Sequence, residues 1–213
     1  MTYDPSVSME ERQQIARENM HEPKPLATTS TDMPHLCSAM LAMLDKEPQR
    51  GGLEETPERW AKSMLALTSG THEDPADVLK VFDDGAENYD AMVMVRGIPF
   101  YSLCEHHVLP FFGIAAVGYI PNGKIVGLSK MSRVVDILAR RLQVQERLTT
   151  QIADVLEQEL QPLGVGVVLQ CRHLCMEARG VRQQGHETLT SALRGVILNS
   201  TEARAEFFRL SKD

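Results

Sequence analysis

The feature that most constrains the fold is a change of pattern near residue 91. After this point, runs rich in Val, Ile, Tyr and Phe alternate with segments whose apolar residues recur at helical spacing. The runs that read as β-strands are at 91–101, 111–120, 124–128, 164–176 and 188–198. The helical segments are a pair at 130–142 and 144–160 and a last helix at 201–210. This order predicts an α+β fold in which an antiparallel sheet carries the helix pair on one face.

The first 90 residues have a different organisation. Helices are expected at 9–20, 33–44, 57–69 and 75–82. The third has the clearest signals, because Thr56 can cap it and Pro57 suits its first position. We therefore divide the chain into an N-terminal appendage and linker (1–30), an N-terminal helical region (31–90) and a third region that carries the chemistry (91–213).

Composition and charge narrow the class of protein. Hydrophobic residues make up 43% of the 213 residues, and no apolar run approaches the roughly 18 residues of a membrane span. The net charge is −7, so no long basic face is expected for nucleic acid. The polar, acidic N-terminus resembles neither a secretory signal nor an Arg-rich transit peptide. We expect a soluble, cytoplasmic protein that binds neither membrane nor nucleic acid.

Two clusters of Cys and His carry the strongest chemical signal. Cys104 and His107 are three residues apart just after a predicted strand, and in a turn both can reach one zinc ion, whose bonds to S and N are about 2.0–2.3 Å long. His173 and Cys175 are two residues apart in another predicted strand, so their side chains should share a face. Sulfur and imidazole ligands suit zinc.

Three interpretations of these clusters are open at this point. The residues could be ordinary buried core, or Cys104, His107, His173 and Cys175 could form a closed structural zinc site. Alternatively, three of them could hold a catalytic zinc ion with a water in the fourth position. With His106 there are five candidate side chains for four positions, and this surplus favours the catalytic site.

Two further groups of residues suggest a nucleotide-binding site. Ser129 at a predicted helix start, with Lys130 and Arg133 in the first turn, could bind phosphate oxygens, although a solvated helix start is equally consistent. The Glu146 carboxylate could accept from the adjacent N1–H and amino group of guanine, or it could simply pair with Arg147 on a helix surface.

Several long motifs, in one order, resemble the GTP cyclohydrolase I family, type IA. They are SLCEHHVLPFFG at 102–113, GLSKMSRVVDILARRLQVQERLTTQI at 127–152, RHLCMEARGV at 172–181 and TLTS at 188–191, with a weaker match, GLEETPERWAK, at 52–62. The resemblance covers roughly residues 33–210.

This resemblance implies the tunnelling fold, in which antiparallel strands and helix pairs of several subunits join into a barrel. It also implies a homodecamer of two face-to-face pentamers with active sites between subunits. The implied reaction converts GTP and water into 7,8-dihydroneopterin triphosphate and formate, with zinc (Zn2+) as the cofactor.

The resemblance also implies roles for individual residues. The implied zinc ligands are Cys104, His107 and Cys175, and the implied catalytic residues are His106 and His173. The implied substrate-binding residues are Glu146 at the guanine, Gln145, and, at the triphosphate, Ser129, Lys130, Arg133, Arg179 and Arg59. One departure is His186, where family members usually carry Ser, and we expect it to be a surface residue.

Two other functions remain as alternatives. One is a different purine or pterin enzyme of the tunnelling fold, such as a type IB cyclohydrolase or a nitrile reductase. The other is a catalytically silent GTP-binding protein. The paired motifs CEHH at 104–107 and HLCM at 173–176 argue against both.

Overall fold

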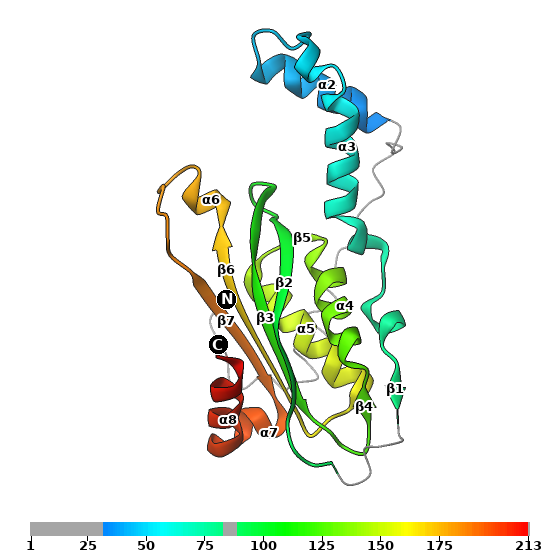
Figure 1. Cartoon of the computed structure of the whole chain (residues 1–213), viewed down its shortest axis with the longest axis vertical. Coiled ribbons are helices and arrows are strands. Elements are labelled where there is room, and N and C mark those ends of the chain that lie inside the picture. Colours follow the sequence, from blue (N-terminus) through cyan, green and yellow to red (C-terminus); the bar gives the residue numbers. More distant parts are fainter. Residues whose placement is uncertain (1–31, 83–88, 213) are drawn as a thin grey trace, which may run out of the picture. The chain divides into compact units, whose positions relative to one another are not determined.

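The computed structural model describes residues 32–82 and 89–212, which form two compact units that meet in the sequence between Trp60 and Ala61 (Figure 1). The first unit contains α2 (Met33–Leu44), the 3-10 helix η2 (Gly51–Leu53) and the beginning of α3 (Thr56–Leu67). The helices predicted at 33–44 and 57–69 are thereby confirmed, although the second ends two residues early. The expected helix at 9–20 and the linker after it lie outside the described residues.

The second unit is built on a five-stranded sheet with the order β5-β2-β3-β6-β7. Its strands are β2 (Val93–Cys104), β3 (Leu109–Ile120), β5 (Leu142–Gln143), β6 (Gly164–His173) and β7 (Thr188–Arg194). All neighbouring pairs are antiparallel except β2 and β5. The predicted α+β class with an antiparallel sheet is confirmed.

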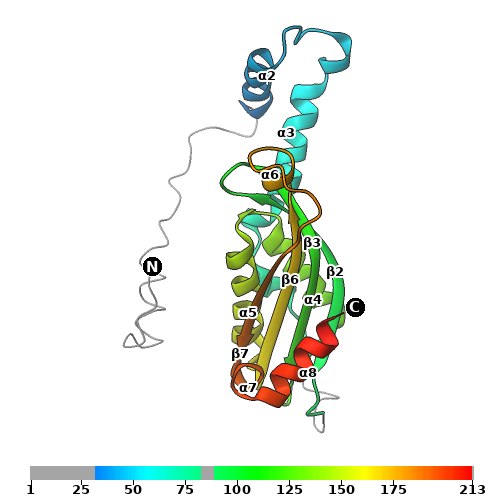
Figure 2. The ribbon, with the colours of Figure 1, turned by 90° about the vertical axis from the view of Figure 1, so that its left-hand side faces the viewer.

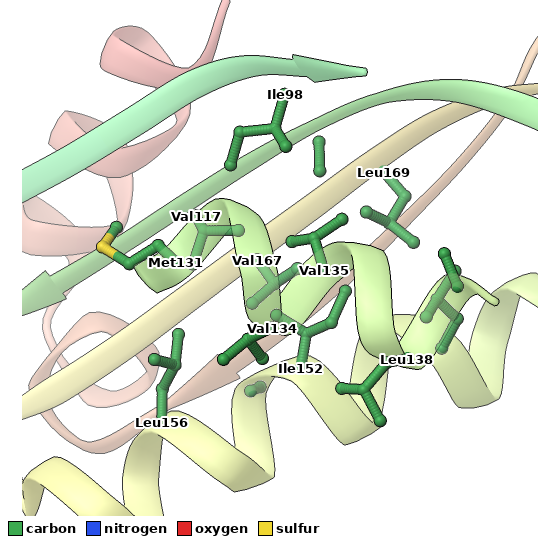
Figure 3. Close-up of a cluster of buried hydrophobic side chains, with 14 of the residues drawn as sticks. Ile98, Val117, Met131, Val134, Val135, Leu138, Ile152, Leu156, Val167 and Leu169 are labelled. Carbon is green, nitrogen blue, oxygen red and sulfur yellow. The ribbon is translucent and has the colours of Figure 1, made fainter. Parts of the chain in front are cut away.

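Helices α4 (Leu128–Ala139) and α5 (Gln145–Leu160) cover one face of this sheet (Figure 2). Between them and the strands lies the core, in which apolar side chains of both layers interdigitate without solvent contact. Figure 3 shows part of it, and its fully buried members include Val117, Val134, Val135, Ile152, Leu156, Val167 and Leu169. The helix pair predicted at 130–142 and 144–160 is therefore confirmed, although α4 begins two residues and ends three residues earlier than predicted.

The last helix, α8 (Thr201–Ser211), packs against the opposite face at one end of the sheet (Figure 2). Its fully buried Phe207 lies against Gly166 of β6. A Cβ on Gly166 would come within 2.5 Å of the Phe207 ring, so this contact requires glycine. Among the residues that the structure describes, no helix is both long and apolar enough to span a membrane.

The helix predicted at 75–82 is wrong. After the 3-10 helix η3 (Ser69–His72), a 3-10 turn η4 (Pro75–Val78) leads into β1 (Val81–Phe82), which pairs with β4 (Ile125–Val126). Asp74 caps the turn by accepting from the Ala76 N–H at 2.9 Å, and the backbone becomes extended again at Leu79. The segment therefore forms a single 3-10 turn followed by a short strand, rather than a helix.

The strands predicted at 164–176 and 188–198 both end early. β6 gives way to the short helix α6 (Leu174–Glu177), and β7 gives way to α7 (Gly195–Asn199). Gly195 adopts a left-handed conformation with φ of 56°, and a Cβ there would lie 2.2 Å from the Leu163 carbonyl oxygen. The chain turns out of β7 at a glycine, which adopts this conformation without strain and leaves room for the Leu163 carbonyl.

Candidate active site

The turn between β2 and β3 folds a histidine back onto the end of β2. Cys104 is the last residue of β2, and its carbonyl oxygen accepts from the N–H groups of His107 and Val108 at 3.3 and 2.8 Å. Val108 has a φ of 52°, a left-handed conformation that β-branched residues rarely adopt. The turn brings His107 Nδ1 to 3.8 Å from Cys104 Sγ.

Helix α6 supplies a third side chain to this turn. One ligand atom each from Cys104, His107 and Cys175 lies within 4.8 Å of the other two. Ligand atoms bound tetrahedrally to one zinc ion are roughly 3.5–3.8 Å apart, so these residues could close on an ion with small side-chain movements. The structure thus brings together the three residues that the resemblance implies as ligands.

The sequence-based reason for grouping His173 with Cys175 is wrong. The prediction placed both on one face of a strand, but β6 ends at His173 and Cys175 lies in the first turn of α6. It is the helical turn that directs Cys175 to the cluster. Within the described part of the chain, the metal-ligand cluster contains three side chains and not His173, so no closed four-ligand site is formed.

The cluster has the chemistry of a cation site. Partial burial raises the pKa of the Cys175 thiol, and the neighbouring Cys104 thiol raises it further, while the charge of Arg179 lowers it. A bound cation reverses this preference, because it stabilises the thiolate form. All four cysteines of the chain are free. Two thiols and an imidazole form a donor set that suits zinc.

His173 lies beside the cluster and is held by two contacts. Its Nε2 is 2.8 Å from Gln145 Oε1, and its ring stacks on Phe111 with a centroid distance of 4.8 Å and an interplanar angle of 5°. Burial lowers the pKa of His173, the Glu146 carboxylate raises it, and His186 lowers it. His173 is therefore a restrained imidazole with a carboxylate nearby.

His106 lies at the exposed rim of the same turn. Its Nδ1 is 3.8 Å from Cys104 Sγ, and its side chain is 64% exposed. Glu105 Oε1 is 4.0 Å from His106 Nε2, while Glu105 Oε2 accepts from Arg147 at 2.5 Å. The structure thus gives the cluster two neighbouring histidines, one restrained and one accessible.

Strand β5 explains how Glu146 reaches this end of the molecule. β5 runs parallel to the end of β2, with Gln143 opposite Cys104, and α5 begins two residues later. Glu146 is therefore in the first turn of α5, exposed, and close enough to affect the pKa of His173. The structure thereby brings this carboxylate near His173.

The three residues of α4 that the sequence predicts as phosphate contacts are not brought to the cluster within one chain. Ser129, Lys130 and Arg133 lie in the first turns of α4, which follows β4 at the opposite end of β3 (Figure 1). A twelve-residue strand such as β3 spans about 36 Å. Partial burial lowers the pKa of Lys130, and the nearby charges of Arg133 and Lys80 lower it further, so three cationic side chains gather at this helix start.

The remaining predicted residue, Arg59, belongs to the first compact unit, where it is ion-paired with Glu55. His186 is partly exposed, but its ring nitrogens are not at the surface. Both of its ring nitrogens are shielded from solvent, without a hydrogen-bond partner among the described residues. No sequence signal predicted this burial, apart from the unusual residue type.

Cys171, in contrast, is packed in β6 and outside the cluster, and burial raises its pKa to about 12.

Comparison with known proteins extends these observations. The family model for GTP cyclohydrolase I matches residues 33–212. The GTP cyclohydrolase 1 of Janthinobacterium sp. (strain Marseille) is 57% identical over 174 residues, which cover 82% of this chain and 88% of that protein. The apo crystal structure of the archaeosine synthase QueF-Like matches 49% of this chain and 93% of that chain, with a TM-score of 0.41 and 19% identity.

Two further relatives agree with the first. The GTP cyclohydrolase 1 of Nitrosospira multiformis is 53% identical over 173 residues, covering 81% of this chain and 91% of that protein. The protein of the same name from Acetivibrio thermocellus is 50% identical over 172 residues, covering 80% and 91%. From the match of the family model and the identity to these relatives, we conclude that the chain belongs to the GTP cyclohydrolase I family of enzymes.

Proposed function

We propose that this enzyme uses zinc to hydrolyse GTP at C8 and rearranges the product to 7,8-dihydroneopterin triphosphate and formate. The observation that carries this proposal is that three groups of side chains lie together at one end of the sheet. They are the Cys104–His107–Cys175 cluster, the histidines beside it and the Glu146 carboxylate. The family membership supports GTP as the substrate.

Zinc is the metal that the donor set fits best. Cys104, His107 and Cys175 would hold it through two sulfurs and one nitrogen, a three-ligand set typical of catalytic rather than structural zinc sites. A zinc ion bound in such an open site makes hydroxide available near pH 7 through its Lewis acidity. We expect the enzyme to act in the cytoplasm, where free thiols stay reduced.

The two histidines are assigned to proton transfers. Protonation of guanine N7 makes C8 more electrophilic, and an imidazole can give this proton and take it back because histidine is the side chain suited to proton transfer near neutral pH. His173, restrained by Gln145 and Phe111, is the proposed donor at N7. The exposed His106 is assigned to ring opening and the later transfers.

Glu146 is the residue that we propose recognises the guanine base. Its carboxylate can accept from both N1–H and the exocyclic amino group, a pair of donors that adenine lacks. Its place in the first turn of α5, near His173, would direct the opposite edge of the purine, with N7 and C8, toward the histidine and the cluster.

Glu146→Gln is expected to weaken GTP binding by at least about tenfold. The substitution replaces a charged acceptor by a neutral amide that presents one acceptor and one donor, and a hydrogen bond to a charged group contributes about 1.5–3 kcal/mol. The dissociation constant for GTP is to be measured by calorimetry on the zinc-loaded variant. An affinity equal to that of the wild type would remove Glu146 from guanine recognition.

The triphosphate requires a second copy of the chain. Ser129, Lys130 and Arg133 could bind phosphate, but within one chain they lie at the far end of β3, further from the cluster than any nucleoside triphosphate can reach. Arg179 is close to the cluster, because its charge acts on Cys175. We propose that active sites form between subunits of a homodecamer of two pentamers, with Arg59 as a further triphosphate contact.

The decisive experiment is to incubate the pure protein with GTP and zinc, with and without a chelator. Formate and a fluorescent pterin are expected only when the metal is present, and adding back zinc should restore both. GTP binding without formate would instead indicate the catalytically silent protein. Undiminished turnover after complete removal of metal would exclude the proposed role of the cluster.

A further inference from the structure

The amide of Gln145 is held in one orientation by its surroundings. Gln145 is 2% exposed, and its Nε2 lies 3.3 Å from the Leu169 carbonyl oxygen and 2.9 Å from the Thr188 carbonyl oxygen. Carbonyl oxygens can only accept, so these two contacts determine which end of the amide carries the nitrogen. The amide oxygen is therefore the atom that faces His173 Nε2, at 2.8 Å.

A ring of hydroxyl contacts reinforces this orientation. Thr149 Oγ1 donates to the Gln145 carbonyl oxygen at 2.7 Å, so its proton is already used. The Thr190 hydroxyl, 2.6 Å away, must then donate to Thr149 Oγ1 and accept from Gln145 Nε2 at 3.0 Å. The amide nitrogen therefore faces acceptors on β6 and β7. The orientation of the Gln145 amide is thus fixed by contacts among α5, β6 and β7.

The orientation of the amide determines the proton position on His173. An amide oxygen has no proton to donate, so a hydrogen bond at this distance requires that His173 Nε2 carries one. A neutral imidazole has a proton on only one nitrogen, which leaves Nδ1 with the lone pair. The stacked Phe111 ring, itself fully buried, limits rotation of the imidazole plane.

We propose that Gln145 is a positioning residue that holds His173 in the Nε2–H form, so that Nδ1 is the nitrogen that exchanges a proton with the substrate. The inference rests on the proposed role of His173 in proton transfer. It replaces the direct substrate contact that the family resemblance implies for Gln145, because the amide hydrogens already face three protein acceptors.

The first test measures the tautomer directly, in the full-length zinc-loaded protein without GTP. The 15N chemical shifts of histidine ring nitrogens distinguish a nitrogen that bears a proton from one with a lone pair. Magic-angle-spinning NMR of 15N-histidine-labelled protein is expected to show a protonated Nε2 in the histidine that contacts the Phe111 ring. A proton on Nδ1 alone would overturn the proposal, whether or not the protein turns over GTP.

The second test separates positioning from substrate binding. Gln145→Met keeps the length of the side chain but removes the amide, and its kcat is expected to fall about tenfold to a hundredfold, as for other losses of catalytic orientation. Its KM for GTP should stay within about threefold. A raised KM with unchanged kcat would show that Gln145 contacts GTP and would overturn the proposal.

Gln143→Met is the matched control. Gln143 is also 2% exposed, but its amide nitrogen donates to the Leu138 carbonyl oxygen and to Gln151 Oε1, away from His173. It should lose similar stability and keep its kcat. An equal loss of kcat in both variants would overturn the proposal, and if Gln145→Met does not fold, the tautomer measurement decides alone.

Discussion

Replacing Cys175 by alanine is expected to abolish stable zinc binding and to lower GTP turnover at least about a hundredfold. Only Cys104 and His107, two neighbours in one turn, would remain to hold the ion. Loss of a group that merely orients a metal ligand typically costs 10–100-fold in affinity or activity, so loss of a ligand should cost more. Zinc per chain after dialysis and formate release at saturating GTP are the measurements.

Cys171→Ala is the matched control for this variant. Cys171 is a free thiol four residues earlier, 1% exposed in the core and outside the metal-ligand cluster. Its replacement should lower the free energy of unfolding by about 1 kcal/mol and leave zinc content and turnover unchanged. If Cys175→Ala kept one zinc ion per chain and normal turnover, the cluster would not be the catalytic metal site.

The two halves of the metal-ligand cluster differ in how far they could be predicted. Cys104 and His107 are close because of a local turn, and local spacing is visible in a sequence. Cys175 was grouped with them correctly but for the wrong reason, because a short apolar run reads equally well as strand or helix. The change from β6 to α6 after His173 falls within one such run, where periodicity does not separate the two structures.

The surroundings of His173 could not be predicted from the sequence. The amide of Gln145 is oriented by carbonyl groups of β6 and β7, so it depends on the register in which Leu169 pairs with Thr190. A register is a long-range property, whereas helix periodicity is local. The long helices α4 and α5 were therefore predicted well, and two-residue strands such as β5, which places Glu146, were missed.

Two inactive variants are expected to restore each other in mixed assemblies, if each active site takes its metal-ligand cluster from one copy and its α4 cations from another. Cys175→Ala destroys the first half of the site, and Lys130→Met removes a cation from the second. In random 1:1 assemblies, about a quarter of the sites would combine two intact halves. Formate release should therefore recover to about a quarter of the wild-type rate per site.

The geometry of one chain explains why this recovery is expected. The start of α4 lies at the end of β3 opposite to Cys104, so an intact site within one chain would require GTP to span the length of the sheet. Mixing Cys175→Ala with Cys104→Ala is the control, because both variants damage the same half and no site can be repaired. If native mass spectrometry shows mixed oligomers of Cys175→Ala and Lys130→Met but no activity returns, the two halves do not come from different copies. Recovery in the first mixture and not in the second would instead show that neighbouring subunits share each site.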